Sequence, residues 1–137
     1  MKYILIFTFI VIAGVIGYVF YSQLNSNQVD TISRNGIHWH PELEIYVKGE
    51  KVEIPQDVGL GVVHNPIHTH EDLPIIHLEF DGVVRKDDIT LKQFFKVWGK
   101  DLSSFGDLSQ MTVNDIGNEM LGEYVMQDGD KIKLVFE

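Results

Sequence analysis

The feature that most constrains this chain is an uncharged apolar run near its start, from Tyr3 to Tyr21. At 1.5 Å per residue, about 20 apolar residues in a helix span the hydrocarbon core of a bilayer. Tyrosines near both ends of the run are typical of the interfacial aromatic belts, and Lys2 favours a cytoplasmic N-terminus. We therefore predict that residues 1–22 form a single-pass transmembrane helix in the cell membrane, with the rest of the chain extracytoplasmic.

A cleaved signal peptide is the alternative interpretation of this run. Signal peptides have shorter apolar regions, of about 7–15 residues, and end in a small-residue cleavage site. The run here is longer, and no convincing site of that kind follows it. An uncleaved anchor is therefore favoured, and both interpretations export the domain. Residues 23–35 are polar and aperiodic, which is typical of a tether between the anchor and a domain at 36–137.

The composition of the chain excludes several classes of function. It has no cysteine, which rules out a disulfide scaffold, a thiolate metal site and a cysteine-ligated copper site. The formal net charge is −9, and every acidic residue lies after position 29. Nucleic acid is therefore not an expected partner, because phosphate binding requires a basic surface.

The domain at 36–137 combines strand patterns with a single helix pattern. Polar and apolar residues alternate over 42–47 and 52–55 around a turn at 48–51, which predicts a β-hairpin. Further short strands are expected at 67–70, 75–80 and 111–113, and an alternating strand at 131–136. Elements segregated in this way indicate an α+β fold with a small mixed sheet.

The helix pattern follows Thr90. Its apolar stripe has the spacing i, i+3, i+4, i+7 and consists of Leu91, Phe94, Phe95 and Trp98. Thr90 and Gln93 have the spacing of a capping box, and Gly99 is suited to end the helix. We interpret the stripe as the face of an amphipathic helix that packs in the core, in preference to a cofactor platform.

The six histidines lie between positions 38 and 77 and include two His-x-His pairs. In an extended segment residues i and i+2 point to the same face, so each pair offers two imidazoles side by side. Two such pairs facing each other would form a metal site, because imidazole is the commonest protein metal ligand. The predicted ligands are His38, His40, His68 and His70, with His77 as a possible fifth. For His64, next to a proline-containing turn, a surface role is preferred.

An all-histidine site outside the cell favours copper, with zinc next. Imidazole suits both ions, and Cu(II) binds more tightly than Zn(II) at a given nitrogen site. A metal-bound imidazole usually donates its other N–H to a carboxylate or a carbonyl group. The carboxylates close enough in sequence are Glu42, Glu44, Glu71, Asp72 and Glu79, although solvated surface charges would have the same pattern.

Several functions remain open for such a domain. The favoured hypothesis is a binding domain that buffers, stores or delivers the ion. One alternative is a pH-sensitive polar cluster that packs two strands together. Another is an interface at which the chain is an accessory subunit of a larger membrane metalloenzyme complex. A small metal-dependent enzyme is a third possibility. We find no His-Glu-x-x-His, nucleophile elbow or phosphate loop, so no catalytic or cofactor-binding residue is assigned and a non-enzymatic role is preferred.

Parts of the domain resemble the β-grasp (ubiquitin-like) fold, namely the hairpin at 43–54, the helix at 91–98 and the ending Tyr-Val-Met-Gln-Asp-Gly-Asp-Lys-Ile-Lys-Leu at 124–134. That ending is similar to the closing strand of small sulfur-carrier proteins. Their terminal Gly-Gly is missing here, so sulfur-carrier chemistry is not implied. On this resemblance, the histidine-rich segment 56–80 is an insertion between the hairpin and the helix.

The chain also resembles a group of membrane-anchored archaeal and bacterial proteins that have no established activity. The shared motifs are His-Trp-His at 38–40, Pro-Ile-His-Thr-His at 66–70, Phe-Phe-x-x-Trp-Gly at 94–99 and Asp-Gly-Asp-Lys-Ile at 128–132. The resemblance implies an exported, anchored and histidine-rich protein.

Overall fold

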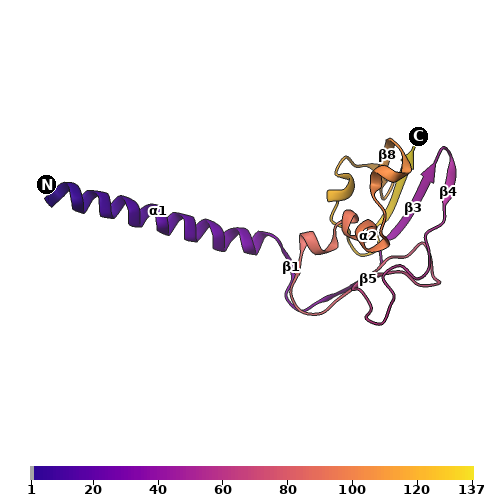
Figure 1. Ribbon diagram of the computed structural model, residues 1–137, viewed down its shortest axis with the longest axis horizontal. Coiled ribbons are helices and arrows are strands. Elements are labelled where there is room, and N and C mark those ends of the chain that lie inside the picture. Colours follow the sequence, from indigo (N-terminus) through magenta and orange to yellow (C-terminus); the bar gives the residue numbers. More distant parts are fainter. Residues whose placement is uncertain (1) are drawn as a thin grey trace. The chain divides into compact units, whose positions relative to one another are not determined.

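A computed structural model describes residues 2–137, except that the side chains of 2–7, 10 and 23–29 lie outside the described set (Figure 1). The chain divides into two compact units, 1–31 and 32–137. Its α-helices are α1 (Lys2–Val29) and α2 (Leu91–Trp98), and its 3₁₀ turns are η1 (Lys86–Ile89), η2 (Leu102–Phe105) and η3 (Leu121–Glu123). Its strands are β1 (Thr31–Ser33), β2 (Ile37–Trp39), β3 (Glu42–Val47), β4 (Glu50–Val52), β5 (Ile67–His68), β6 (His77–Phe80), β7 (Val84–Arg85), β8 (Leu108–Val113), β9 (Ile116–Gly117) and β10 (Lys131–Phe136).

Helix α1 makes up nearly all of the first unit. It continues through residues 23–29, a segment without glycine or proline that we expect to belong to the tether. Within the part of the chain that the structure describes, no helix is both long and apolar enough to cross a membrane. The anchor predicted at 1–22 falls partly on residues outside the described set, so it stays a prediction.

The second unit is built on a five-stranded sheet with the order β4-β3-β10-β8-β9. The middle strand, β10, runs parallel to β3 on one side and antiparallel to β8 on the other. The hairpin between β3 and β4 turns on two residues with positive φ, Lys48 and Gly49. The predicted hairpin is therefore confirmed, with a shorter turn than expected, and so is the α+β class.

Helix α2 has the predicted bounds and buries Leu91, Phe94 and Phe95 in the core. It ends at Gly99, which has the left-handed φ of 72°. The predicted capping box is wrong, because the buried Thr90 hydroxyl makes no capping hydrogen bond. The segment leading into the helix pairs with the chain near Val125 through backbone hydrogen bonds, and these hold the helix start in its place.

A separate three-stranded sheet has the order β2-β6-β5. Its core face includes Ile76 and Leu78, which are fully buried, while His77 and Glu79 point to the opposite face, as their alternation predicts. The chain passes from β2 directly into β3 through the buried Pro41, whose carbonyl accepts a hydrogen bond from the Ile76 N–H. The histidine-bearing sheet is thus joined to the five-stranded sheet at the point where the two strands meet.

Candidate metal centre

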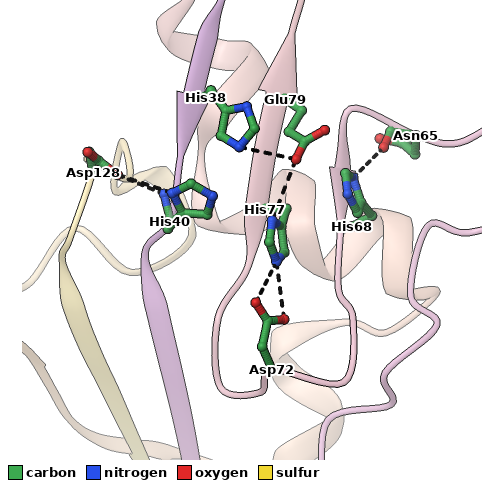
Figure 2. A network of polar contacts seen from close by, with 8 residues as sticks. All are labelled: His38, His40, Asn65, His68, Asp72, His77, Glu79 and Asp128. Atoms are coloured by element: carbon green, nitrogen blue, oxygen red, sulfur yellow. Dashed lines mark hydrogen bonds and ion pairs between the residues drawn. The ribbon is translucent and has the colours of Figure 1, made fainter.

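The order of the three strands sets the order of the histidines. On β2, His38 lies directly opposite Glu79 of β6, and on the other side His68 of β5 lies opposite His77 of β6. The sequence predicts that the two His-x-His pairs face each other. In the structure they do not, because strand β6 lies between them. Because neighbouring strands are about 4.8 Å apart, the outer pairs start about 10 Å apart. Figure 2 shows Glu79 between His38 and His68, with His77 beside it.

Three imidazole rings gather on the β5 side of β6. The ring centroids are 4.8 Å apart for His68 and His70, 5.0 Å for His70 and His77, and 5.3 Å for His68 and His77. Three imidazoles bound to one tetrahedral ion at 2.0–2.1 Å would have centroids about 5 Å apart. The spacing of these rings is compatible with a shared ion, and the positions of the ring nitrogens decide which of the three can bind it.

The side chains whose ligand atoms converge are His68, His77 and Glu79. Their ligand atoms lie within 4.8 Å of one another, and the three together could hold a metal ion. Among the residues that the structure describes, no other group of this kind is found, so His70 contributes a neighbouring ring and not a converging nitrogen. In the sequence Glu79 was only a candidate partner of a bound histidine. Its signal there is its i+2 spacing from His77, which places it on the same face.

Oxygen atoms at the periphery of the cluster orient the two central rings. The Nε2 atom of His77 lies 3.1 Å from both carboxylate oxygens of Asp72, and Nδ1 of His68 lies 3.0 Å from the backbone carbonyl of Asn65 (Figure 2). Since these oxygens accept the ring N–H groups, the neutral rings carry their lone pairs at Nδ1 of His77 and at Nε2 of His68. Both lone pairs are then available to a cation.

The electrostatic setting favours the form of each ring that binds a metal. Burial lowers the pKa of His68, so this ring stays neutral more readily than an exposed histidine. The hydrogen bond from His77 lowers the pKa of Asp72, which therefore stays ionised. The Nδ1 atom of His77 is buried and has no hydrogen-bond partner in the described chain, while Glu79 Oε1 lies 3.6 Å away.

His38 on β2 and His40 just after it lie on the exposed side of the cluster. The rings of His38 and His40 are 4.8 Å apart, which confirms that they share a face, and the His40 ring is 5.0 Å from that of His77. His38 Nε2 is 3.4 Å from Glu79 Oε1. Asp128, in the turn before β10, accepts a 2.8 Å hydrogen bond from the His40 backbone and lies 3.9 Å from its Nδ1.

The loop before β5 covers His68 and explains its burial. Thr69 joins this loop to β5: its hydroxyl donates to the Pro55 carbonyl at 2.7 Å and accepts from the Val58 N–H at 3.1 Å. His64, at the end of the loop, is exposed, and its ring centroid is 6.3 Å from that of His68. This position agrees with the surface role preferred for it.

The carboxylates considered as partners divide into two kinds. Asp72 and Glu79 contact histidines, as described above. Glu44, in contrast, forms a 2.6 Å ion pair with Lys51 of the neighbouring strand, and hydrogen bonding to that lysine lowers the pKa of the carboxyl group. Proximity in sequence alone does not separate these two kinds.

Comparison with known proteins gave no match to a family model, a curated protein or a solved structure.

Proposed function

We propose that this chain is a membrane-anchored extracytoplasmic domain that binds a divalent transition ion, copper or zinc, through His68, His77 and Glu79. The observation that carries the proposal is the unpartnered Nδ1 of His77, buried and 3.6 Å from a carboxylate oxygen of Glu79. With the N–H at Nε2 directed to Asp72, two acceptor atoms face each other without a proton between them. A cation bound by both removes this repulsion and satisfies the buried nitrogen.

The two imidazoles and one carboxylate of this site favour a transition-metal ion such as zinc or copper. Imidazole and carboxylate ligands suit zinc and copper, whereas calcium and magnesium prefer sites made of oxygen atoms alone. Copper binds more tightly than zinc at a given set of nitrogen ligands, so copper is the expected ion where both are equally available. With a membrane anchor at 1–22, the domain would buffer, store or deliver the ion at the outer surface of the cell.

The fold proposed for the domain is β-grasp-like. The support is the parallel pair β3 and β10 in the middle of the sheet, with α2 following the β3-β4 hairpin in the chain. Strands β5 and β6 then belong to the insertion at 56–80, and β2 precedes the hairpin. The metal site would thus be an addition to the scaffold, built beside the sheet that carries the fold.

The experiment is elemental analysis of the full chain, purified in mild detergent without a histidine tag and loaded with Cu²⁺ or Zn²⁺. The His68→Ala and His77→Ala variants are compared with His64→Ala, an exposed histidine outside the converging group. We expect His64→Ala to keep the metal content of the wild type and the other two to lose one ion per chain. Circular dichroism checks that each variant is folded.

Failure of the wild type to bind either ion after loading would contradict the proposal. The histidines would then have the structural or interface role of an accessory subunit. Equal metal content in all three variants would also contradict it, because the ion would then be held elsewhere.

A catalytic site is the second candidate, favoured by the number of converging ligands. Three protein ligands leave one tetrahedral position for water, and two histidines with one glutamate form the ligand set of several hydrolytic zinc sites. Replacing zinc with Co²⁺ and titrating with azide tests this point. A change in the visible spectrum indicates an open position, and an unchanged spectrum indicates that another ligand, such as His70, closes the site.

A further inference from the structure

We propose that the histidine cluster holds two metal ions, with Glu79 as a bridging ligand and His38 and His40 as the ligands of the second ion. This inference rests on the proposed function, because the first ion is the one bound by His68, His77 and Glu79. It adds a second position on the opposite side of β6, with a different affinity and a different exposure to solvent.

The distances around Glu79 carry the argument. Its Oε1 atom lies 3.4 Å from Nε2 of His38 and 3.6 Å from Nδ1 of His77. Two ligands of a tetrahedral ion with bonds of 2.0–2.1 Å are separated by about 3.3–3.4 Å. Both separations are close to this value. The Glu79 carboxylate could therefore share one ion with His38 and another with His77. Both contacts are made by the same oxygen, Oε1, which has a histidine nitrogen from β2 on one side and one from β6 on the other and is therefore the atom suited to bridge two ions.

The strand order explains why one ion does not serve all the histidines. His38 and His68 lie on strands separated by β6, about 10 Å apart at the backbone, and His40 and His70 follow closely after the ends of those strands. Strand β6 lies between the two pairs of histidines. Side chains of β6, such as Glu79, are therefore the ligands that an ion on either side can share. The cluster therefore divides into two halves that share Glu79.

The β2 half shares part of the construction of the β5 half, although among the described residues only the ligand atoms of His68, His77 and Glu79 already lie within 4.8 Å of one another. Asp128 accepts a hydrogen bond from the backbone N–H of His40 and lies 3.9 Å from its Nδ1, whereas Asp72 and the Asn65 carbonyl contact ring nitrogens of His77 and His68 directly (Figure 2). For His68 and His77 the peripheral oxygen accepts one ring N–H and leaves the other nitrogen to bind, the arrangement typical of metal-bound imidazoles, and for His40 Asp128 holds the backbone that carries the ring. Three carboxylates, Asp72, Glu79 and Asp128, contact the cluster and offset the charge of two divalent ions.

The second position is open to solvent, whereas the first is covered. The side chain of His38 is 65% exposed and that of His77 is 12% exposed. His38 and Glu79 also line a surface pocket together with Asn35 and Asp81. We therefore expect the second ion to bind more weakly and to exchange faster, as a position for loading and release would require.

The test measures stoichiometry and magnetic coupling on the full chain loaded with Cu²⁺. The wild type should bind two ions per chain in two steps of unequal affinity. Two Cu(II) ions about 3.5–4 Å apart couple magnetically, so their electron paramagnetic resonance intensity should fall below that of two isolated ions. The His38→Ala/His40→Ala variant should bind one ion with the full intensity of an isolated centre, and His64→Ala should behave as the wild type.

The outcomes separate this inference from the proposed function. One ion in the wild type that persists in His38→Ala/His40→Ala overturns the two-metal centre and leaves the metal-binding function standing. One ion that is lost both in that variant and in His68→Ala also overturns it, because a single ion would then join both halves. No ion in the wild type overturns both proposals.

Discussion

At the scale of the residue, the geometry of the cluster depends on groups that would not touch the ion. Asp72 is the plainest case: it accepts the Nε2 proton of His77 and so determines which nitrogen carries the lone pair. Exposed carboxylates are common on this acidic chain, and the position of Asp72 five residues before His77 is what gives this one its role. It is a positioning residue and not a ligand.

We predict that Asp72→Asn lowers metal affinity about 10- to 100-fold, the usual effect of losing such a partner. The amide can still accept the hydrogen bond, but it lacks the charge that makes the ring a better donor. Affinity is measured by competition with a chelator, beside Asp87→Asn, an exposed aspartate of η1. The melting temperature of the metal-free protein should change little. Equal affinities in the two variants would contradict the role assigned to Asp72.

The sequence predicted that the paired histidines are metal ligands, because their spacing is rare and imidazole is a specific metal ligand. It did not predict Glu79 as a ligand, since the chain contains 20 acidic residues and the one local signal, the i+2 spacing from His77, shows a shared face but not a shared ion. The distinguishing fact is the convergence of Glu79 with His77 and with His68 of the neighbouring strand, which joins positions apart in sequence.

At the scale of the element, strand β5 depends on the loop that covers it. Gly59 of this loop has a φ of 74°, and a Cβ there would meet the Ile67 carbonyl oxygen at 2.3 Å and the His68 Cβ at 3.2 Å. The loop therefore lies against β5 only because this position has no side chain. Its closeness to the backbone of β5 keeps His68 buried.

We predict that Gly59→Ala lowers the free energy of unfolding by about 2–3 kcal/mol, through backbone strain and the clash with β5. Gly49→Ala is the matched control, since its φ is 82° but nothing lies within 4 Å of the added Cβ. It should cost about 1 kcal/mol, from strain alone. Urea denaturation of both variants gives the comparison, and equal losses would show that the contact with β5 is unimportant.

Local patterns predicted which helices and strands are present better than they predicted the residues at which these begin and end. The bounds of α2 agree because its stripe and its terminal glycine both lie in the helix itself. The capping box failed because Thr90 is buried against the segment at Val125, a contact that no local pattern contains. The strands expected at 67–70 and 75–80 are shorter in the structure, since their ends leave the sheet to form turns.

At the scale of the whole molecule, Asp130 ties distant parts of the second unit together. Its buried carboxylate accepts hydrogen bonds from the Tyr124 hydroxyl at 2.7 Å and from the Asn114 side chain at 3.1 Å. Its carbonyl accepts from the Glu42 N–H at the start of β3. Burial, and then the hydrogen bond to Asp130, raise the pKa of Tyr124 far above its ordinary value.

This raised pKa gives the stability of the unit a pH dependence in the alkaline range. A group whose pKa is higher in the folded state stabilises the fold fully below its unfolded pKa, about 10 for tyrosine, and this contribution is lost as pH rises further. We predict that the difference in unfolding free energy between wild type and Tyr124→Phe shrinks by about 1.4 kcal/mol per pH unit above about pH 10. Urea denaturation at pH 8, 10 and 11 measures it. A constant difference across this range would contradict the prediction.

The sequence predicted the α+β class, but not the arrangement that decides how the histidines meet. Strand β2 precedes the hairpin in the chain, and yet it pairs with β6, which follows the hairpin. A hydrogen bond between the Ile76 N–H and the Pro41 carbonyl continues this contact. The two His-x-His pairs consequently lie on opposite sides of β6, a result of strand order that spacing along the chain cannot supply. The division of the cluster into two halves is therefore a property of the assembled domain.

The connection of β2 to β3 has a consequence for how the domain would respond to its surroundings. The proposed ligands extend from position 38 to position 79, and they meet only when the hairpin and the insertion have folded. Metal binding and folding are then linked equilibria, and a free ion at 100 times its dissociation constant would add about 2.7 kcal/mol to the unfolding free energy. The folded fraction of this domain, and hence its survival against proteases, would then report the concentration of free metal around it.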